Sequence, residues 1–332
     1  MRMLFRIPSA HPLRLLAYAA ISLASLAMTT ISRADFPDKP IHVVVPAPAG
    51  GVTDIVARLL AKKLSDAFRQ PVVVDNRPGG GGNVGVGSVA RAAADGYTLA
   101  MSTVGPHGAN PALYGTMPFN PVADFAPISL LAAFPNIISV HPAVPVKNLS
   151  ELLALARKSP GGLSYASSGN GTSGHLGMEM LKSQTGAPLL HIPYKGGAPA
   201  IADVMAGHVP ALVDSVVSSL PQLRAGKLRA IAHTGTGSIS VAPEIPAVAD
   251  TLSGFEATSW VGLLAPARTP PEIIRRLNEE TVKAVNSDEF RQTLASRGAQ
   301  ALSSTPEQFA AYIRAEIDKW GAVVRAANIR AD

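Results

Sequence analysis

The sequence has no cysteine among its 332 residues, and this absence excludes disulfide bridges, thiolate metal sites and cysteine nucleophiles. It is also poor in charge, because Asp, Glu, Lys and Arg together make up 16% of the chain. Disordered chains combine low hydrophobicity with high charge, whereas 47% of this chain is hydrophobic. The composition therefore predicts a large apolar core without covalent cross-links, and the length suits two domains.

No segment after residue 34 is long and apolar enough to cross a membrane. The apolar run Leu15–Met28 follows a start with three arginines, and the small residues Ser32–Ala34 match the pattern that signal peptidase reads. A membrane span needs about 20 apolar residues, so this run is short for an anchor. We expect a secretory signal peptide over residues 1–34, cleaved after Ala34.

The mature chain also lacks a strong excess of basic residues. The full chain has a formal net charge of +6, from 29 Lys and Arg against 23 Asp and Glu. Residues 1–34 hold four of the arginines and no acid, which leaves (29 − 4) − 23 = +2. We expect no nucleic-acid partner, because a phosphate-binding surface needs a pronounced basic excess.

Strand-like and helix-like segments alternate along the mature chain. Predicted strands lie over Ile41–Val45, Pro71–Val74 and Tyr97–Met101, and the helix Thr53–Phe68 separates the first two. This alternation predicts an α/β fold in which parallel sheets are covered by helices. Residues 104–127 are rich in Pro, Gly and Asn, which predicts a long surface connection.

Three later segments have the signature of a capped helix start. In Asn148–Glu151, Thr269–Glu272 and Thr305–Gln308, a short polar residue stands three positions before Glu or Gln. Each spacing predicts a helix whose first N–H groups are bound by the polar side chain.

Two apolar runs, Ile128–Val140 and Ala257–Leu264, could carry the chain to a second domain and back. We therefore predict a first domain of residues 35–136 plus 258–332 and a second domain of residues 137–257.

The stretch between the first strand and the first helix holds Gly50 and Gly51. The first turn of a helix has N–H groups without internal acceptors, and the helix dipole adds partial positive charge there. The stretch can therefore hold an anion such as a carboxylate. The alternative is a plain turn that needs glycine only for its geometry. Asp54 more simply caps N–H groups of its own helix than takes part in chemistry.

A second glycine-rich loop follows the second strand. Its spacing Gly80-x-Gly82-x-x-Gly85 matches the dinucleotide fingerprint, but no acid that could hold a ribose occurs between Asp95 and Asp124. We therefore expect no nucleotide cofactor, and we infer that backbone N–H groups of this loop face a small anion.

A third polar turn, Ser167–Ser173, lies between a strand and a helix. Its short side chains could donate to a ligand or simply cap the helix. A secreted hydrolase of small esters that uses Ser173 or Ser168 is the enzyme alternative. The nucleophile elbow, however, needs glycine two residues after the serine, and His175 stands there.

The remaining candidate side chains are isolated along the chain. Eight histidines form no HExxH motif and no cluster with metal-ligand spacing, so we expect no metal site. His107 is the histidine of interest, because it lies in the polar loop Thr103–Asn110. Lys195 follows a strand and could meet a carboxylate or be a solvated turn lysine. Asp214 ends a strand and could accept from a ligand amine or hydroxyl, or cap the next helix.

Several strands in each half therefore end in donor-rich turns. Ligands of open α/β sheets bind outside the carboxyl ends of the strands. Two such lobes that face each other form a cleft, and hinge closure over a ligand is the usual motion.

The mature chain resembles the substrate-binding proteins of tripartite tricarboxylate transporters, the Bug family, from about Phe36 to Ile329. The resemblance is carried by the segments PAPAGGVTD (46–54), NRPGGGGN (76–83), DGYT (95–98), NPALY (110–114), DFAP (124–127), YASSGNGT (165–172), PYKG (193–196) and FEATSW (255–260). It implies a type II-like, two-lobe periplasmic binding fold with two interdomain crossovers.

The same resemblance implies a monomer that has no catalytic activity and no cofactor. Such a protein captures a small carboxylate in the periplasm and delivers it to a membrane permease; a sensory module that presents the ligand is a further alternative. The ligand-binding residues that the resemblance implies are Gly50, Gly51, Thr53, Asp54, Asn83, Thr103, His107, Ser168, Gly169, Asn170, Thr172, Tyr194, Lys195 and Asp214.

Overall fold

The structure, a computed structural model, describes residues 36–330 of the chain. The predicted signal peptide and its cleavage site lie outside this range. Lys39–Asp332 form one compact unit, and the description below concerns that unit. None of the helices within residues 36–330 combines the length and the hydrophobicity needed to cross a membrane.

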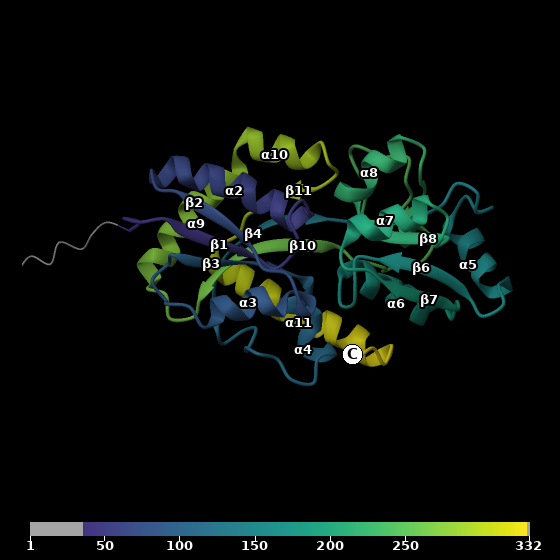
Figure 1. Ribbon diagram of the computed structural model, residues 1–332, viewed down its shortest axis with the longest axis horizontal. Helices are drawn as coiled ribbons and strands as arrows, with labels where there is room; N and C mark the ends of the chain where they lie inside the picture. The colour runs from purple at the N-terminus through teal and green to yellow at the C-terminus, as the bar shows by residue number, and fades with distance from the viewer. Residues whose placement is uncertain (1–35, 331–332) are drawn as a thin grey trace, which may run out of the picture. The chain divides into compact units, whose positions relative to one another are not determined.

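Two β-sheets organise the compact unit (Figure 1). In spatial order, the six strands of the first sheet are β11 (Gln300–Ala301), β4 (Phe125–Phe134), β10 (Ser259–Pro266), β3 (Thr98–Thr103), β1 (Ile41–Val45) and β2 (Val72–Asn76). The five strands of the second sheet are β7 (Leu189–Pro193), β6 (Leu163–Ser167), β8 (Ala211–Ser215), β5 (Asn136–Val140) and β9 (Arg229–His233).

Helices cover both faces of each sheet (Figure 1). The first sheet carries α2 (Val52–Phe68), α9 (Pro271–Asn286) and α10 (Asp288–Ala295) on one face, and α3 (Asn83–Ala90), α4 (Asn110–Leu113) and α11 (Pro306–Ala326) on the other. The second sheet carries α7 (Gly197–Met205) and α8 (Val216–Arg224) on one face, and α5 (Leu149–Lys158) and α6 (Ser173–Thr185) on the other. Short helical turns are η1 (Gly80–Gly82), η2 (Gly105–Ala109) and η3 (Val248–Asp250).

Strand directions are mixed, so the parallel arrangement predicted from the alternation holds for part of each sheet. β1 runs parallel to β2 and β3, and β6 runs parallel to β7 and β8, as the alternation of strands and helices predicts. However, β10 is antiparallel to β3 and β4, and β5 is antiparallel to β8 and β9. These two strands enter their sheet from the other sheet, so they start at the edge where the parallel strands end.

The chain passes between the sheets twice, at Pro135 and between His233 and Ser259. The two passages are tied together by hydrogen bonds. The Asn136 N–H donates to Thr234 Oγ1 at 3.0 Å, and the Thr234 hydroxyl donates to the Ala257 carbonyl at 2.9 Å.

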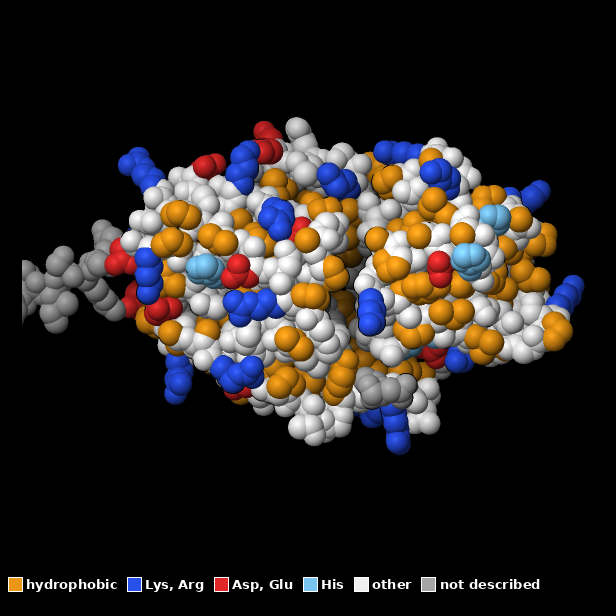
Figure 2. Space-filling view, in the orientation of Figure 1, with side chains coloured by type: hydrophobic (Ala, Val, Ile, Leu, Met, Phe, Trp, Pro, Cys, Tyr) orange, Lys and Arg blue, Asp and Glu red, His pale blue; other side chains and the backbone are white. Residues whose placement is uncertain are grey.

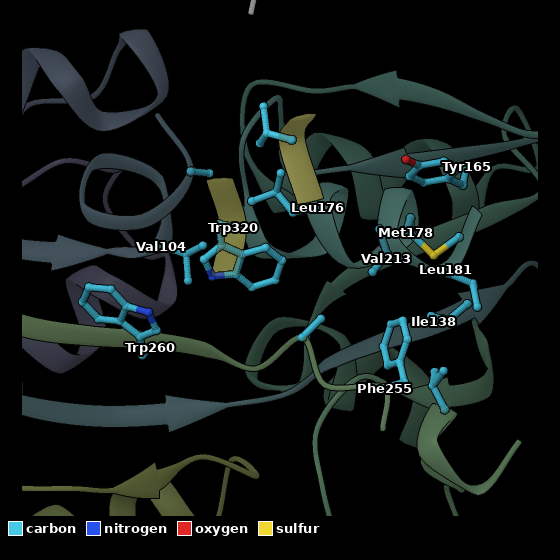
Figure 3. Close-up of a cluster of buried hydrophobic side chains, with 14 of the residues drawn as sticks. Val104, Ile138, Tyr165, Leu176, Met178, Leu181, Val213, Phe255, Trp260 and Trp320 are labelled. Carbon is cyan, nitrogen blue, oxygen red and sulfur yellow. The ribbon is translucent and has the colours of Figure 1, made fainter. Parts of the chain in front are cut away.

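The C-terminal helix α11 packs against elements of both sheets. Its Glu316 carboxylate is buried and accepts the indole N–H of Trp260 at 2.8 Å and that of Trp320 at 2.7 Å. Figure 3 shows Trp320 between Val104, which follows β3, and Leu176 of α6. One continuous apolar core therefore connects the two halves.

Residues 104–113 differ from the predicted surface connection. All five residues of η2 are buried, and α11 packs over this turn. The small residue Gly108 permits that contact, because a Cβ atom there would lie 2.9 Å from Trp320 Cδ1. Proline and glycine indicate an irregular backbone in this segment, but the apolar contacts bury it.

Two of the three predicted helix caps are confirmed. Asn148 accepts from the Glu151 N–H at 2.9 Å, and Thr305 accepts from the Gln308 N–H at 3.2 Å. The prediction for Thr269 is wrong, since α9 starts at Pro271 and the Thr269 hydroxyl donates to the Pro266 carbonyl at 2.7 Å. The helix therefore begins one residue later than predicted, with Pro270 as its N-cap and Pro271 as its first residue.

Gly262 of β10 lies under the buried ring of Phe309, and a Cβ atom at this position would overlap the ring. We expect Gly262→Ala to lower the free energy of unfolding by about 1–3 kcal/mol, because overpacking forces a rearrangement of the core. The control is Gly115→Ala, since nothing lies within 4 Å of a Cβ atom there. Urea unfolding of the two variants with equal stability would contradict the packing described.

Candidate functional site

A cavity of about 730 Å³ opens where the parallel strands of the two sheets end. Its walls come from both halves of the compact unit, and Figure 2 shows the surface hollowed between them. The helices α2, α3, α6, α7 and α8 all begin at this wall. The site is therefore built from strand-to-helix turns, as the sequence predicts.

The β1–α2 turn forms one wall, and the buried carboxylate of Asp54 holds it from behind. Asp54 Oδ2 accepts from the Gly50 N–H at 2.9 Å and from Arg58 Nε at 3.0 Å, and Oδ1 accepts from Asn76 Nδ2 at 3.0 Å. Burial raises the pKa of Asp54, but the hydrogen bonds and the charge of Arg58 outweigh this and lower it below its ordinary value. Asp54 thus serves the turn as an anion, but the one backbone N–H that it binds belongs to Gly50, before the helix, so α2 has no side-chain cap.

Neither glycine of this turn offers an uncovered N–H group, because Gly50 donates to Asp54 Oδ2 and Gly51 donates to the Pro48 carbonyl at 3.4 Å. Gly51 lines the cavity and is the N-cap of α2, with no side-chain cap. Within residues 36–330, no hydrogen-bond acceptor faces the N–H groups of Val52, Thr53 and Asp54, the first turn of α2. The available donors therefore belong to the helix itself.

The second glycine-rich loop lines the cavity with Gly79–Gly82, which all have positive φ. Such a run is open to glycine alone without strain. Behind it, Asn110 Nδ2 donates to the Gly81 carbonyl at 3.0 Å and to Asn83 Oδ1 at 2.7 Å. Asn83 is therefore a buried support of the loop rather than part of the cavity wall.

The β6–α6 turn contributes Ser168–Ser173 to the opposite wall. Several of its polar groups serve the turn itself. Thr172 is the N-cap of α6 and donates to the Gly169 carbonyl at 2.8 Å, while the Gly171 N–H donates to His175 Nδ1 at 3.2 Å. Ser173 Oγ accepts from Asn136 Nδ2 at 3.1 Å. The sequence allowed this turn either to cap α6 or to bind a ligand. The structure shows the cap, made by Thr172.

The β7–α7 turn brings the one cationic side chain of the cavity lining, the exposed Lys195. Its neighbour Tyr194 lines the cavity too, but the phenol donates to Asp203 Oδ2 at 2.5 Å. That hydrogen bond, with burial and the charge of Asp203, raises the pKa of Tyr194 to about 12. The N-cap of α7 is Gly196, which offers no side-chain cap to the helix.

Asp214 at the end of β8 is the one carboxylate of the cavity lining, and it is 6% exposed. Its Oδ2 is buried without a hydrogen-bond partner. Burial raises the pKa of Asp214 to about 6, although hydrogen bonds from the Ser215 backbone and the Ser168 side chain oppose the shift. Asp214 therefore changes charge near neutral pH inside a wall made of donors.

The structure brings ten of the fourteen predicted ligand-binding residues to the cavity wall. These are Gly51, Thr53, Thr103, Ser168, Gly169, Asn170, Thr172, Tyr194, Lys195 and Asp214. Gly50, Asp54 and Asn83 lie outside this lining and support it, as described above.

His107 does not line the cavity, contrary to its apparent place in a polar loop. Its ring is fully buried beside Phe119 and Phe125 and shares a 2.7 Å hydrogen bond with Ser102 Oγ. Burial lowers its pKa to about 3, so the imidazole is neutral at physiological pH. It is a core histidine.

The sequence reasoning missed an apolar part of the wall. Tyr114, Phe134 and Trp260 line the cavity together with Asn136 and Ser259. Four of these residues lie where the chain passes between the sheets, so no turn motif marks them. Ser259 and Trp260 nevertheless belong to the FEATSW segment, and Tyr114 ends NPALY, so the resemblance offered a signal for three of the five.

The wall offers helix starts and hydroxyl donors from both sides, with a single cation and a single buried acid. This arrangement suits a small anion, which backbone N–H groups at helix starts can hold. Among residues 36–330, no group of three or more His, Cys, Asp or Glu side chains could hold a metal ion.

Comparison with known proteins gives a consistent set of similarities. A family model described as tripartite tricarboxylate transporter family receptor matches residues 56–329. Protein BugT of Bordetella pertussis is 36% identical over 315 residues, which cover 94% of this chain and 97% of BugT.

Two solved structures with bound carboxylates are also similar. R. palustris Rpa4515 with adipate is 36% identical, with a TM-score of 0.85, and the match covers 89% of this chain and 99% of that one. MatC from Rhodopseudomonas palustris with bound malate is 32% identical, with a TM-score of 0.81, and the match covers 87% of this chain and 100% of that one.

The raised pKa of Asp214 predicts a pH-dependent stability. Folding raises this pKa from 3.8 to about 6, so the folded protein loses stability as the pH rises from 4 through 6. The loss amounts to about 3 kcal/mol at pH 7, and Asp214→Asn should remove it. In urea unfolding, the free energy of unfolding of the variant should rise relative to that of the wild type between pH 4 and pH 7. Exposed Asp66→Asn is the control, and parallel pH profiles for wild type and Asp214→Asn would contradict the shift.

Proposed function

Because the chain belongs to the tripartite tricarboxylate transporter receptor family, we propose that it captures a small carboxylate between its two lobes and delivers it to a membrane permease. We take residues 35–136 with 258–332 as the first lobe and residues 137–257 as the second. The receptors of this family are periplasmic, and we propose the same location here after removal of residues 1–34.

The convergence of helix starts from both lobes on one cavity is the observation that carries this proposal. A carboxylate is bound by N–H groups such as those of Val52 and Thr53, because the first turn has no acceptors for them and the helix dipole favours a negative charge. The single cation Lys195 adds attraction from the second lobe. The adipate and malate in the two similar structures belong to the same chemical class.

Closure of the lobes buries the ligand, and the contacts across the cavity support this step. A Cβ atom on Gly171 of the second lobe would lie 2.9 Å from Leu113 and 3.0 Å from Asn110 of the first. The missing side chain thus permits close approach of the two rims. The hydrogen-bonded passages at Asn136 and Thr234 provide a hinge, and the permease recognises the closed form.

The ligand leaves chemically unchanged, since the cavity holds no recognisable nucleophile and base. Ser173 pairs with Asn136, and Ser168 hydrogen-bonds to Asp214. A serine hydrolase needs a histidine beside its nucleophile, and no hydrogen bond within residues 36–330 joins a histidine to either serine. We propose a monomeric binding protein without cofactor or nucleic-acid partner; a sensory module would bind its ligand in the same way.

Thermal melting against succinate, adipate, malate and benzoate tests the proposal. A ligand at 100 times its Kd adds about 2.7 kcal/mol of stability, which should raise Tm measurably. The mixtures are then assayed for conversion of the added compound. A missing Tm shift for every acid, or steady turnover of one, would contradict carboxylate capture.

Gly51→Val tests whether the carboxylate binds at the start of α2. The φ of Gly51 is −74°, and a Cβ atom there would lie 3.4 Å from the Pro48 carbonyl, so the backbone and the Cβ position accept a side chain. The added isopropyl group should cover the start of α2 and weaken binding at least tenfold, while the Tm without ligand changes little. The control is Val73→Ala on the exposed edge strand β2, away from the cavity, which should leave the affinity unchanged. Unchanged affinity by calorimetry would place the seat elsewhere.

A further inference from the structure

We infer that Asp214 couples the binding of a carboxylate in this cavity to the uptake of one proton from solvent. The inference rests on the proposed carboxylate capture and adds a pH dependence to it. The proton goes to the Asp214 carboxylate, and no bond in the ligand forms or breaks.

The position of Asp214 sets up this coupling. It is the one acid among the residues of the cavity wall, where five helices begin. Its Oδ2 is buried without a partner, and the oxygen is packed so closely against Gly197, at the start of α7, that a Cβ atom there would overlap it. An anionic ligand therefore enters the site of a second, buried anion.

No neighbouring cation neutralises Asp214. Lys195 lines the same cavity, but no ion pair within residues 36–330 joins it to Asp214. The groups that do act on Asp214 are the neutral Ser168 and Ser215, from the β6–α6 turn and the end of β8. The Tyr194 hydroxyl donates its hydrogen bond to Asp203 and not to Asp214.

The histidines nearest this wall do not titrate in the same range. His175 lies behind the β6–α6 turn and stacks on His191, with ring centroids 3.9 Å apart. Burial lowers the pKa of His175 to about 4 and that of His191 to about 3. His175 and His191 therefore contribute no proton exchange between pH 5.5 and pH 8, and the Asp214→Asn variant isolates the share of Asp214.

Two like charges that share a site raise the pKa of the weaker acid. Burial already holds the pKa of Asp214 at about 6, so at pH 7 the empty protein is mostly ionised there. A bound carboxylate shifts this pKa further upward, and the protein takes up a proton to relieve the repulsion. By linkage, affinity then falls as the pH rises above 6, by up to about tenfold per pH unit.

The experiment measures Kd and proton uptake for wild type, Asp214→Asn and Lys195→Met between pH 5.5 and pH 8. The probe is whichever of succinate, adipate, malate and benzoate raises Tm most. Calorimetry in two buffers of different ionisation enthalpy gives the number of protons taken up. Asparagine has the shape of the protonated acid, so Asp214→Asn should bind tightly at every pH without proton uptake.

For the wild type we expect uptake of up to one proton at pH 7 and a Kd that rises at least fivefold from pH 6 to pH 8. Lys195→Met should weaken binding at all pH values and keep the pH slope. Binding by the wild type without proton uptake would overturn the inference and leave carboxylate capture standing. Loss of binding by Asp214→Asn at every pH would also overturn it, because Asp214 would then be an acceptor for a donor group of the ligand. If none of the four acids binds, carboxylate capture itself would be overturned.

Discussion

The site depends on backbone N–H groups that cannot be bonded within their own helices. Each α-helix leaves the donors of its first turn without partners, and parallel strands direct successive helix starts to one edge of the sheet. Here α2 and α3 begin at the edge of the first sheet, and α6, α7 and α8 at that of the second. Anion binding is thus a consequence of topology, and the side chains around it mainly hold these turns in place.

The buried polar residues behind the wall illustrate that supporting role. Asp54 fixes the β1–α2 turn through Gly50, and Asn110 fixes the second glycine-rich loop through Gly81. Each binds one backbone group of its turn and at least one neighbouring side chain. Buried polar groups are normally hydrogen-bonded, so the same bonds that satisfy the Asp54 carboxylate and the Asn110 amide nitrogen also fix the turns.

Local patterns predicted the strand-to-helix turns, because glycine, short polar residues and a following helical period all lie within a few positions of each other. They did not place His107, which lies in a polar stretch of sequence yet packs beside Phe119 and Phe125. They also missed Phe134 and Trp260, and the antiparallel direction of β5 and β10. These features arise where the chain passes between the sheets, and contacts between distant segments decide them.

The different roles of backbone N–H groups and wall side chains bear on which ligand is selected. Backbone N–H groups recognise a carboxylate but not the rest of the molecule that carries it, so discrimination among acids falls to the few side chains of the wall. Tyr114, Phe134 and Trp260 present aromatic surface, whereas Lys195 and Asp214 supply opposite charges on the second lobe. On the proposed carboxylate capture, the aromatic residues would limit the shape of the ligand, and the ionised fraction of Asp214 would limit its negative charge. A receptor that binds a carboxylate through such turns could change its ligand at a handful of wall positions while the turns stay the same.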